Sequence, residues 1–123
     1  RMRQLAAELF EAKHCNLKLD FDERLNAVKM GMEERKNFYL IYKEALNNIA
    51  KYAECKNVGI ELRLDHAEIV LKIEDDGKGF NIQHVQQGNG FGNMQRRAEA
   101  LKGNLLVTSN VGEGTSVELR FAV

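Results

Sequence analysis

The stretch from Phe38 to Ala53 constrains the fold of this 123-residue chain more than any other part of it. Its apolar residues recur at steps of mostly three and one, so at about 100° per residue they cover one broad arc of a helix. Opposite that arc, Glu44, Asn48 and Lys51 stand at i, i+4 and i+7 and share one narrow stripe. The pattern predicts a long helix that packs one face against a core and presents polar groups on the other.

A solvated amphipathic face is the favoured interpretation of that stripe when the helix is taken alone. Asn47 lies beside the stripe and Tyr52 at its boundary. Asparagine is a mediocre helix former, so two asparagines in mid-helix shift the interpretation toward binding. The segments further along the chain favour a binding role for this stripe more strongly.

Length and charge narrow the classes to which this chain can belong. Its 123 residues are expected to form a single domain, residues 1–123. The 18 basic and 18 acidic residues balance, so no global field favours nucleic acid or an anionic membrane. No apolar run approaches the roughly 18 residues that span a bilayer, and no signal peptide is visible. Cys15 and Cys55 show no metal-ligand spacing, which favours free thiols in a reducing cytoplasm.

The first third of the chain predicts a helix and one or two strands before the long helix. Residues 1–13 keep helical spacing with no cap before them, which indicates the end of an opening helix in a fragment of a longer protein. Leu17 to Phe21 alternates as a half-buried strand. The short apolar piece from Ala27 to Met30 is expected to form a second, weaker strand.

Strands predominate after the long helix. Residues 58–64 and 69–73 alternate on either side of a turn through Asp65 and His66, which indicates an antiparallel hairpin. Further on, strands are predicted from Leu105 and from Val117, with a turn at 112–115 between them.

A glycine-rich segment, residues 76–93, separates the two pairs of strands. Phe91 to Leu101 has the spacing of a helix, which Gly103 is expected to cap. Helices and a mixed, mostly antiparallel sheet with one apolar face predict an α/β two-layer sandwich, with the helices packed on one face of the sheet.

Asp75 is the most informative single residue. It has the same parity as Ile69, Leu71 and Ile73, so it points to the side on which these apolar residues pack. A carboxylate that faces a core costs several kcal/mol unless a donor reaches it. One interpretation is that the strand ends just before Asp75 and leaves a solvated turn acid. The other is a ligand that brings its own donor, such as an exocyclic amine.

Two glycine clusters follow Asp75. Gly77 and Gly79 would let the backbone approach a flat ligand closely, whereas a calcium loop is excluded because the acids at EF-hand spacing are missing. The segment 88–92 (GNGFG) opens the second helix. It is a weak match to a dinucleotide fingerprint, since no strand directly precedes it, but glycines at a helix N-terminus suit phosphate.

Together these pieces resemble the ATP-binding (Bergerat) fold shared by gyrase, chaperone, histidine-kinase and mismatch-repair ATPases, the GHKL superfamily. They are most similar to the catalytic domain of two-component sensor histidine kinases with a short lid. Four elements carry the resemblance in the family's order: the N box at 44–53 (EALNNIAKYA), glycine boxes at 75–80 (DDGKGF) and 88–94 (GNGFGNM), and the glycine-threonine element that ends at Thr115.

The resemblance implies a role for each matched position. Asp75 would accept from the adenine amino group, Asn48 would hold Mg²⁺, Lys51 would approach the phosphates, and Glu44 would orient water or metal. Thr115 would support the Asp75 end of the pocket. The glycine-rich residues 76–93 would form the ATP lid. The remaining implied nucleotide contacts are Asn47, Tyr52, Gly77, Gly79, Phe80, Gly88, Gly90, Phe91 and Gly92.

Two departures from the family's pattern stand out. Tyr52 occupies a place where this motif usually carries histidine, which puts that residue's contact in doubt, and Arg96 stands where close relatives often have glutamate. No phosphoacceptor motif, a histidine followed by an acid on a dimerisation helix, is present. The three histidines, His14, His66 and His84, are interpreted as surface residues.

The resemblance therefore implies the Mg-ATP-binding catalytic domain of a sensor histidine kinase. It would transfer the γ-phosphate of ATP to a histidine on a dimerisation domain that this chain lacks, with a response regulator downstream. The domain is expected in the cytoplasm, without nucleic-acid or membrane contact, although its parent is expected to be membrane-anchored. The alternative is an anti-sigma-factor-type serine kinase of the same fold. A degenerate fold without nucleotide is weakened by the completeness of the motifs.

Overall fold

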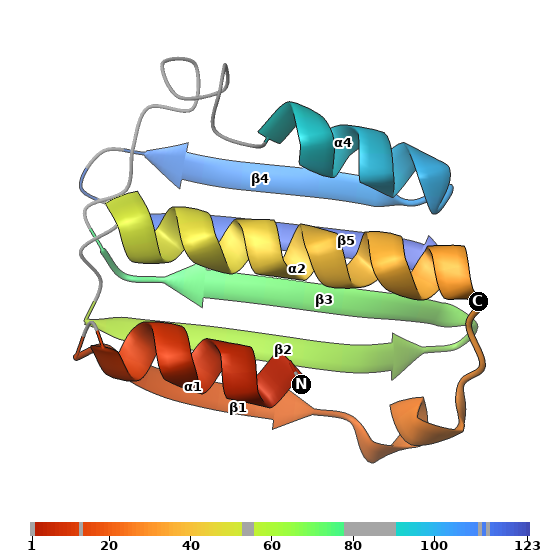
Figure 1. Cartoon of the computed structure of the whole chain (residues 1–123), viewed down its shortest axis with the longest axis horizontal. Coiled ribbons are helices and arrows are strands. Elements are labelled where there is room, and N and C mark those ends of the chain that lie inside the picture. Colours follow the sequence, from red (N-terminus) through yellow and green to blue (C-terminus); the bar gives the residue numbers. More distant parts are fainter. Residues whose placement is uncertain (1, 13, 53–55, 78–90, 111, 113) are drawn as a thin grey trace.

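A layer of helices covers one face of a five-stranded sheet in the computed structural model, which describes residues 2–12, 14–52, 56–77, 91–110, 112 and 114–123 (Figure 1). The helices are α1 (Met2–Ala12), α2 (Met32–Tyr52) and α4 (Phe91–Ala100). All three lie in front of the strands in Figure 1. The predicted two-layer α/β sandwich is confirmed.

The sheet is mixed, as expected. Its strands follow the order β1-β2-β3-β5-β4. The pair β1–β2 is parallel and the other three pairs are antiparallel. Because α2 lies in sequence between β1 and β2, it provides the crossover that a parallel pair needs. The strand bounds are Asn16–Phe21 (β1), Asn57–Asp65 (β2), Glu68–Asp75 (β3), Asn104–Asn110 (β4) and Gly114–Ala122 (β5).

The core lies between α2 and the inner face of the sheet. Phe38, Ile41, Tyr42 and Leu46 of α2 are all at most 5% exposed, which confirms the apolar arc predicted for this helix. The ring of Phe38 also packs at a tilt against that of Phe121 of β5, with ring centroids 5.5 Å apart. Burial of this arc fixes the rotation of α2 about its axis, so it also fixes where the polar residues of that helix point.

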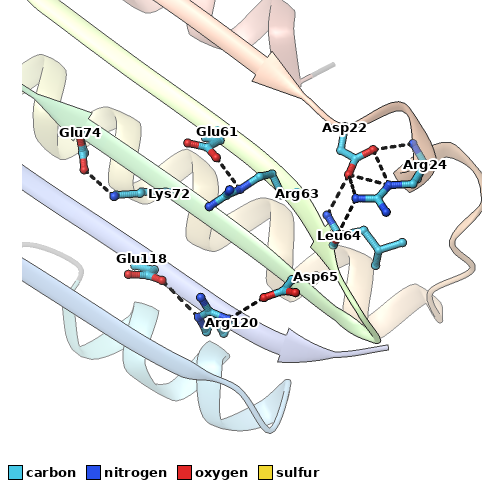
Figure 2. A network of polar contacts seen from close by, with 10 residues as sticks. All are labelled: Asp22, Arg24, Glu61, Arg63, Leu64, Asp65, Lys72, Glu74, Glu118 and Arg120. Carbon is cyan, nitrogen blue, oxygen red and sulfur yellow. Dashed lines mark hydrogen bonds and ion pairs between the residues drawn. The ribbon is translucent and has the colours of Figure 1, made fainter.

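The expected weak strand at Ala27–Met30 is wrong. The structure has a 3₁₀ helix, η1 (Glu23–Ala27), followed by irregular chain. Asp22 caps η1 by accepting from the backbone N–H of Arg24 at 2.9 Å, and the two side chains form an ion pair at 2.7 Å (Figure 2). A local acid–arginine turn thus overrides the short apolar run, because so few apolar residues cannot specify a strand.

The outer face of the sheet carries charges of both signs, as Figure 2 shows. Lys72 pairs with Glu74 at 3.0 Å, and Arg120 reaches Glu118 at 3.2 Å and Asp65 at 3.5 Å. Exposed pairs of this kind contribute little stability each. Because this face of the sheet is polar, it can face water without a second layer of helices. This agrees with the alternation of apolar and polar residues along the strands.

The cap of α4 differs from the prediction. The left-handed residue is Lys102 (φ 57°), and not Gly103. The N–H of Lys102 donates to Glu99 O and that of Gly103 to Ala98 O, both at 2.9 Å, which is the Schellman pattern. Gly103 is required by packing instead, since a Cβ there would lie 2.5 Å from the backbone oxygen of Arg120.

We expect adjacent substitutions at this cap to have opposite effects on stability. Lys102→Gly relieves a left-handed backbone and should raise the free energy of unfolding by about 1 kcal/mol. Gly103→Ala forces a Cβ against β5 and should lower it by about 1–3 kcal/mol. Urea unfolding followed by circular dichroism measures both. A shift of the two midpoints in the same direction would contradict this account of the cap.

Candidate functional site

Asp75 ends β3 and points into the molecule. It pairs in register with Val58 of β2 and Thr115 of β5, so the interpretation in which the strand stops before Asp75 is wrong. The residue is 9% exposed. Its Oδ1 accepts from the N–H of Gly77 at 2.8 Å, while its buried Oδ2 has no hydrogen-bond partner among the residues that the structure describes. The parity argument from the sequence is therefore confirmed, and one acceptor of this acid is left free.

Burial raises the pKa of Asp75 above its ordinary value, and the neighbouring charge of Asp76 raises that pKa further. The N–H of Gly77 and the hydroxyl of Thr115 act in the opposite direction but do not cancel the effect of burial. The protein's own donors thus leave this carboxylate undersupplied. A ligand that donates to Oδ2 would stabilise the ionised acid.

Thr115 lies opposite Asp75 on the adjacent strand β5. It is 5% exposed, and its Oγ1 lies 2.8 Å from Oγ of Ser109 on β4. Ser109 also donates to the backbone oxygen of Gly114 at 3.2 Å. Gly114 has φ +85°, and a Cβ there would lie 2.2 Å from the backbone oxygen of Asp75. The turn glycine is therefore needed both for its backbone conformation and for this close approach.

The sequence reasoning missed Ser109 and Asp76. The turn predicted between the last two strands contained a signal for Ser109, because a hairpin through that turn sets Ser109 opposite Thr115, as the register of β4 and β5 shows. Asp76 accepts from the backbone N–H groups of Lys56 and Asn57, at 3.0 and 2.7 Å. No local pattern identifies those donors, since they lie about twenty positions earlier in the chain.

Asn48 is a buried polar residue of α2. It is 7% exposed, and no described residue forms a hydrogen bond with its amide nitrogen. Glu44 and Asn47 are half-buried on the same helix, so the predicted stripe lies partly within the protein and not wholly in solvent. Lys51 and Tyr52 belong to the last turn of α2, but their side chains lie outside the described part of the structure.

Several predicted residues fall where the structure gives little or no description. Gly79, Phe80, Gly88 and Gly90 lie outside the described residues, as does His84. Phe91 begins α4, with a side chain that is likewise not described, and a Cβ on Gly92 would meet nothing within 4 Å. The lid roles of these residues stay predictions.

The two remaining histidines lie at turns. His14 follows α1 and His66 joins β2 to β3; both are exposed and both have positive φ, at 58° and 57°. The expectation that these two are surface residues is confirmed.

Asn48, Asp75 and Thr115 are the buried polar residues of the described part of the chain. The C-terminal ends of α2 and β3 and the start of β5 meet at one end of the molecule in Figure 1. An unsatisfied buried polar group costs roughly 1–3 kcal/mol. Two of them at one end of the molecule favour a site at which a ligand supplies the missing partners.

A groove of about 650 Å³ lies at the other end of α2, and its lining residues include Leu25, Val28 and Tyr39. It contains none of the three buried polar residues. Directional chemistry depends on polar groups with free hydrogen-bonding capacity, so we place the candidate site at Asp75 rather than in this groove.

Comparison with known proteins places the chain among ATPases. Residues 33–123 match the family of histidine kinase-, DNA gyrase B- and HSP90-like ATPases. The sensor histidine kinase LiaS of Bacillus subtilis (strain 168) is 28% identical over 106 residues, which are 85% of this chain and 29% of LiaS. The chain thus spans less than a third of the length of this curated relative.

Solved structures agree in fold. The histidine kinase domain from the Erythrobacter litoralis EL346 blue-light activated histidine kinase superposes with a TM-score of 0.82 at 20% identity, over 98% of this chain and 58% of that one. The Acinetobacter baumannii histidine kinase AdeS superposes with a TM-score of 0.72 at 16% identity, over 98% of this chain and 62% of that one. At these identities the likeness shows the fold alone.

We expect Asp75→Asn to stabilise the ligand-free chain at pH 7, by on the order of 1 kcal/mol, because it removes a buried charge while an amide oxygen can still accept from Gly77. Because folding raises the pKa of Asp75, the unsubstituted chain binds a proton more tightly when it is folded than when it is unfolded. The advantage of the variant should shrink as the pH falls through that raised pKa and vanish below the ordinary value of 3.8.

Urea unfolding between pH 7 and pH 3.5 tests this prediction. Glu74→Gln is the matched control: Glu74 is the adjacent acid and is exposed, so its substitution should change stability by less than about 0.5 kcal/mol. A less stable Asp75→Asn chain at pH 7 would show that donors within the protein already compensate the carboxylate.

Proposed function

Because the chain belongs to the family of histidine kinase-, DNA gyrase B- and HSP90-like ATPases, we propose that it is the Mg-ATP-binding catalytic domain of a sensor histidine kinase. The observation that carries this proposal is the buried Oδ2 of Asp75, an acceptor that has no partner within the described part of a chain from an ATPase family. The family match confirms the resemblance drawn from the four sequence motifs.

The adenine end of the site is proposed at Asp75. Its free Oδ2 can accept from the exocyclic amine of adenine, and a hydrogen bond to a charged acceptor contributes about 1.5–3 kcal/mol. Oδ1 is already held by Gly77 at 2.8 Å, so the carboxylate is fixed before the nucleotide arrives. Thr115, buried opposite Asp75 in the register, would keep the carboxylate in this orientation.

The phosphate end of the site is proposed on α2. Asn48 has a buried, unpartnered amide, and a half-turn of that amide exchanges its oxygen and nitrogen without other change. The same position can therefore offer an oxygen to Mg²⁺ or an N–H to a phosphate. Magnesium, when bound, would neutralise charge on the β- and γ-phosphates. Glu44 would orient water or the metal, and Lys51 would approach the phosphates.

The remaining contacts are proposed from the motifs. Asn47 and Tyr52 would lie beside the phosphates at the end of α2. The glycine-rich lid would close over the nucleotide, its N–H groups directed at phosphate oxygens where α4 begins. The lid residues concerned are Gly77, Gly79, Phe80, Gly88, Gly90, Phe91 and Gly92.

We propose that the γ-phosphate is transferred to a histidine on a dimerisation domain of the same kinase, outside this chain, and passes on to a response regulator. Phosphoryl transfer depends mainly on holding donor and acceptor in line, so an acceptor at an exposed turn such as His14 or His66 suits it poorly. The relatives described above are histidine kinases, so the anti-sigma serine kinase is not favoured. The proposed location is the cytoplasm, on a kinase that is itself membrane-anchored.

No helix of the described residues combines the length and the apolar composition needed to cross a bilayer.

The nucleotide site makes two separable predictions for calorimetric titration. Asp75→Asn replaces an acceptor by a donor that faces the adenine amine, so ATP affinity should fall at least about tenfold. Asn48→Leu keeps a similar volume but cannot ligate a metal, so it should still bind ATP and lose most of the gain that Mg²⁺ gives. Unchanged affinity in the first variant, or an equal magnesium effect in the second, would refute the corresponding assignment.

The transfer step can be tested with radiolabelled ATP. Alone, the 123-residue chain should acquire almost no acid-labile label. When the dimerisation helices of its parent are added, these should become labelled, and the Asp75→Asn chain should not label them. Strong self-labelling at His14, His66 or His84 would contradict an acceptor outside this chain. Labelling of an added antagonist serine would instead support the anti-sigma alternative.

A further inference from the structure

The carboxylate of Asp76 binds the start of β2. Its Oδ1 accepts from the backbone N–H groups of Lys56 at 3.0 Å and Asn57 at 2.7 Å, and its Oδ2 accepts from Nδ2 of Asn57 at 2.7 Å. The backbone N–H of Asp76 in turn donates to the oxygen of Asn57 at 3.2 Å. Four hydrogen bonds to one dipeptide make this exposed acid a clamp, in contrast to a solvated turn residue.

These bonds hold Asp76 in its ionised form. The side chain and the backbone N–H of Asn57, followed by the N–H of Lys56, lower the pKa of Asp76. The clamp is therefore made of charge-assisted hydrogen bonds at neutral pH, which are shorter and stronger than bonds between neutral groups.

The clamp lies between two parts of the proposed nucleotide site. On one side, Asp76 separates Asp75 from Gly77, whose N–H holds Oδ1 of Asp75 at 2.8 Å. On the other side, Lys56 and Asn57 are the first described residues after α2, the helix that carries Asn48. Asn57 is held in turn by Nδ2 of Asn16 on β1, at 3.2 Å. The direction of the chain at Gly77 therefore depends on a contact with the segment that follows α2.

A purely structural strap between β2 and β3 is the competing interpretation. The eight register pairs from Val58–Asp75 to Asp65–Glu68 already hold these strands together without the carboxylate of Asp76. What they do not fix is the position of residues 76 and 77, which lie beyond the last pair. The contribution of the clamp is thus expected in the geometry of the loop that begins the lid rather than in the hairpin.

We propose that Asp76 is a positioning residue of the nucleotide site, which aligns Gly77 and Asp75 by clamping the loop after β3 to Lys56 and Asn57. The proposal rests on the nucleotide-binding function proposed above. Asp76 touches no part of the nucleotide in this proposal. It acts through Gly77, whose N–H sets the orientation of the carboxylate that receives adenine.

A reciprocal exchange of side chains tests the clamp. Asn57→Asp sets two carboxylates against each other and should weaken ATP binding about fivefold or more; Asp76→Asn sets two amide donors against each other and should weaken it in the same direction. The double variant restores a donor facing an acceptor, keeps the net charge of the parent, and should bind within about twofold of the parent. Glu74→Gln, which makes the same charge change as Asp76→Asn at the exposed acid before Asp75, should bind like the parent.

Calorimetric titration with ATP, well below the unfolding midpoint of each chain, distinguishes the outcomes. Weaker binding by the single variants with recovery in the double variant supports the clamp. Parental affinity in both single variants, or no recovery in the double variant, overturns it. Where a single variant fails to fold, Asn57→Ala removes only the side-chain part of the clamp, and should lower affinity about twofold.

The two proposals fail differently. In one case the unsubstituted chain binds ATP, the Asp75→Asn variant has lost ATP binding, and the Asp76 and Asn57 variants have kept it. Only the positioning role is then overturned. If the parent does not bind ATP at all, the nucleotide function is overturned and the positioning role with it.

Discussion

Burial of the Asp75 carboxylate is the constraint on which the rest of the site depends. The strand that carries it ends with its last inward position occupied by an acid, where the three preceding inward positions hold apolar residues. Such a position weakens the ligand-free fold, because burial raises the pKa of the acid and none of the described residues donates to one of its oxygens. A protein retains a destabilising group of this kind where function requires it.

The helix α2 joins the stability of the fold to the geometry of the site. One arc of this helix fills the core, and the burial of Tyr42 and Leu46 fixes its rotation. The direction of the Asn48 side chain is therefore set by the packing of neighbouring residues such as Leu46, two positions earlier on the same helix. A site built on a packed helix and on strand ends is held more rigidly than one built on loops alone.

Much of the fold followed from periodicity, but several details of the site did not. Strand parity predicted that Asp75 points inward, because β3 is long and regular; helical spacing placed Asn48 on the polar stripe of α2, and the structure shows that this residue is buried. The strand expected at Ala27–Met30 failed because four residues are too few to specify a strand against the capping acid Asp22. Gly103 was assigned to the wrong role because its neighbour across the sheet, Arg120, is far away in sequence. The clamp at Asp76 depends on contacts of the same long-range kind.

The parallel pairing of β1 has a consequence for the order of folding. Asn16 of β1 pairs with Asn57, which lies 41 positions later in the chain, whereas β2 and β3 are joined by a two-residue turn. Closing a short turn costs far less chain entropy than closing the loop that contains the whole of α2. We therefore expect the hairpin to form first and to present the edge on which β1 docks once α2 has folded between them. During synthesis, β1 therefore leaves the ribosome well before β2, the strand with which it pairs.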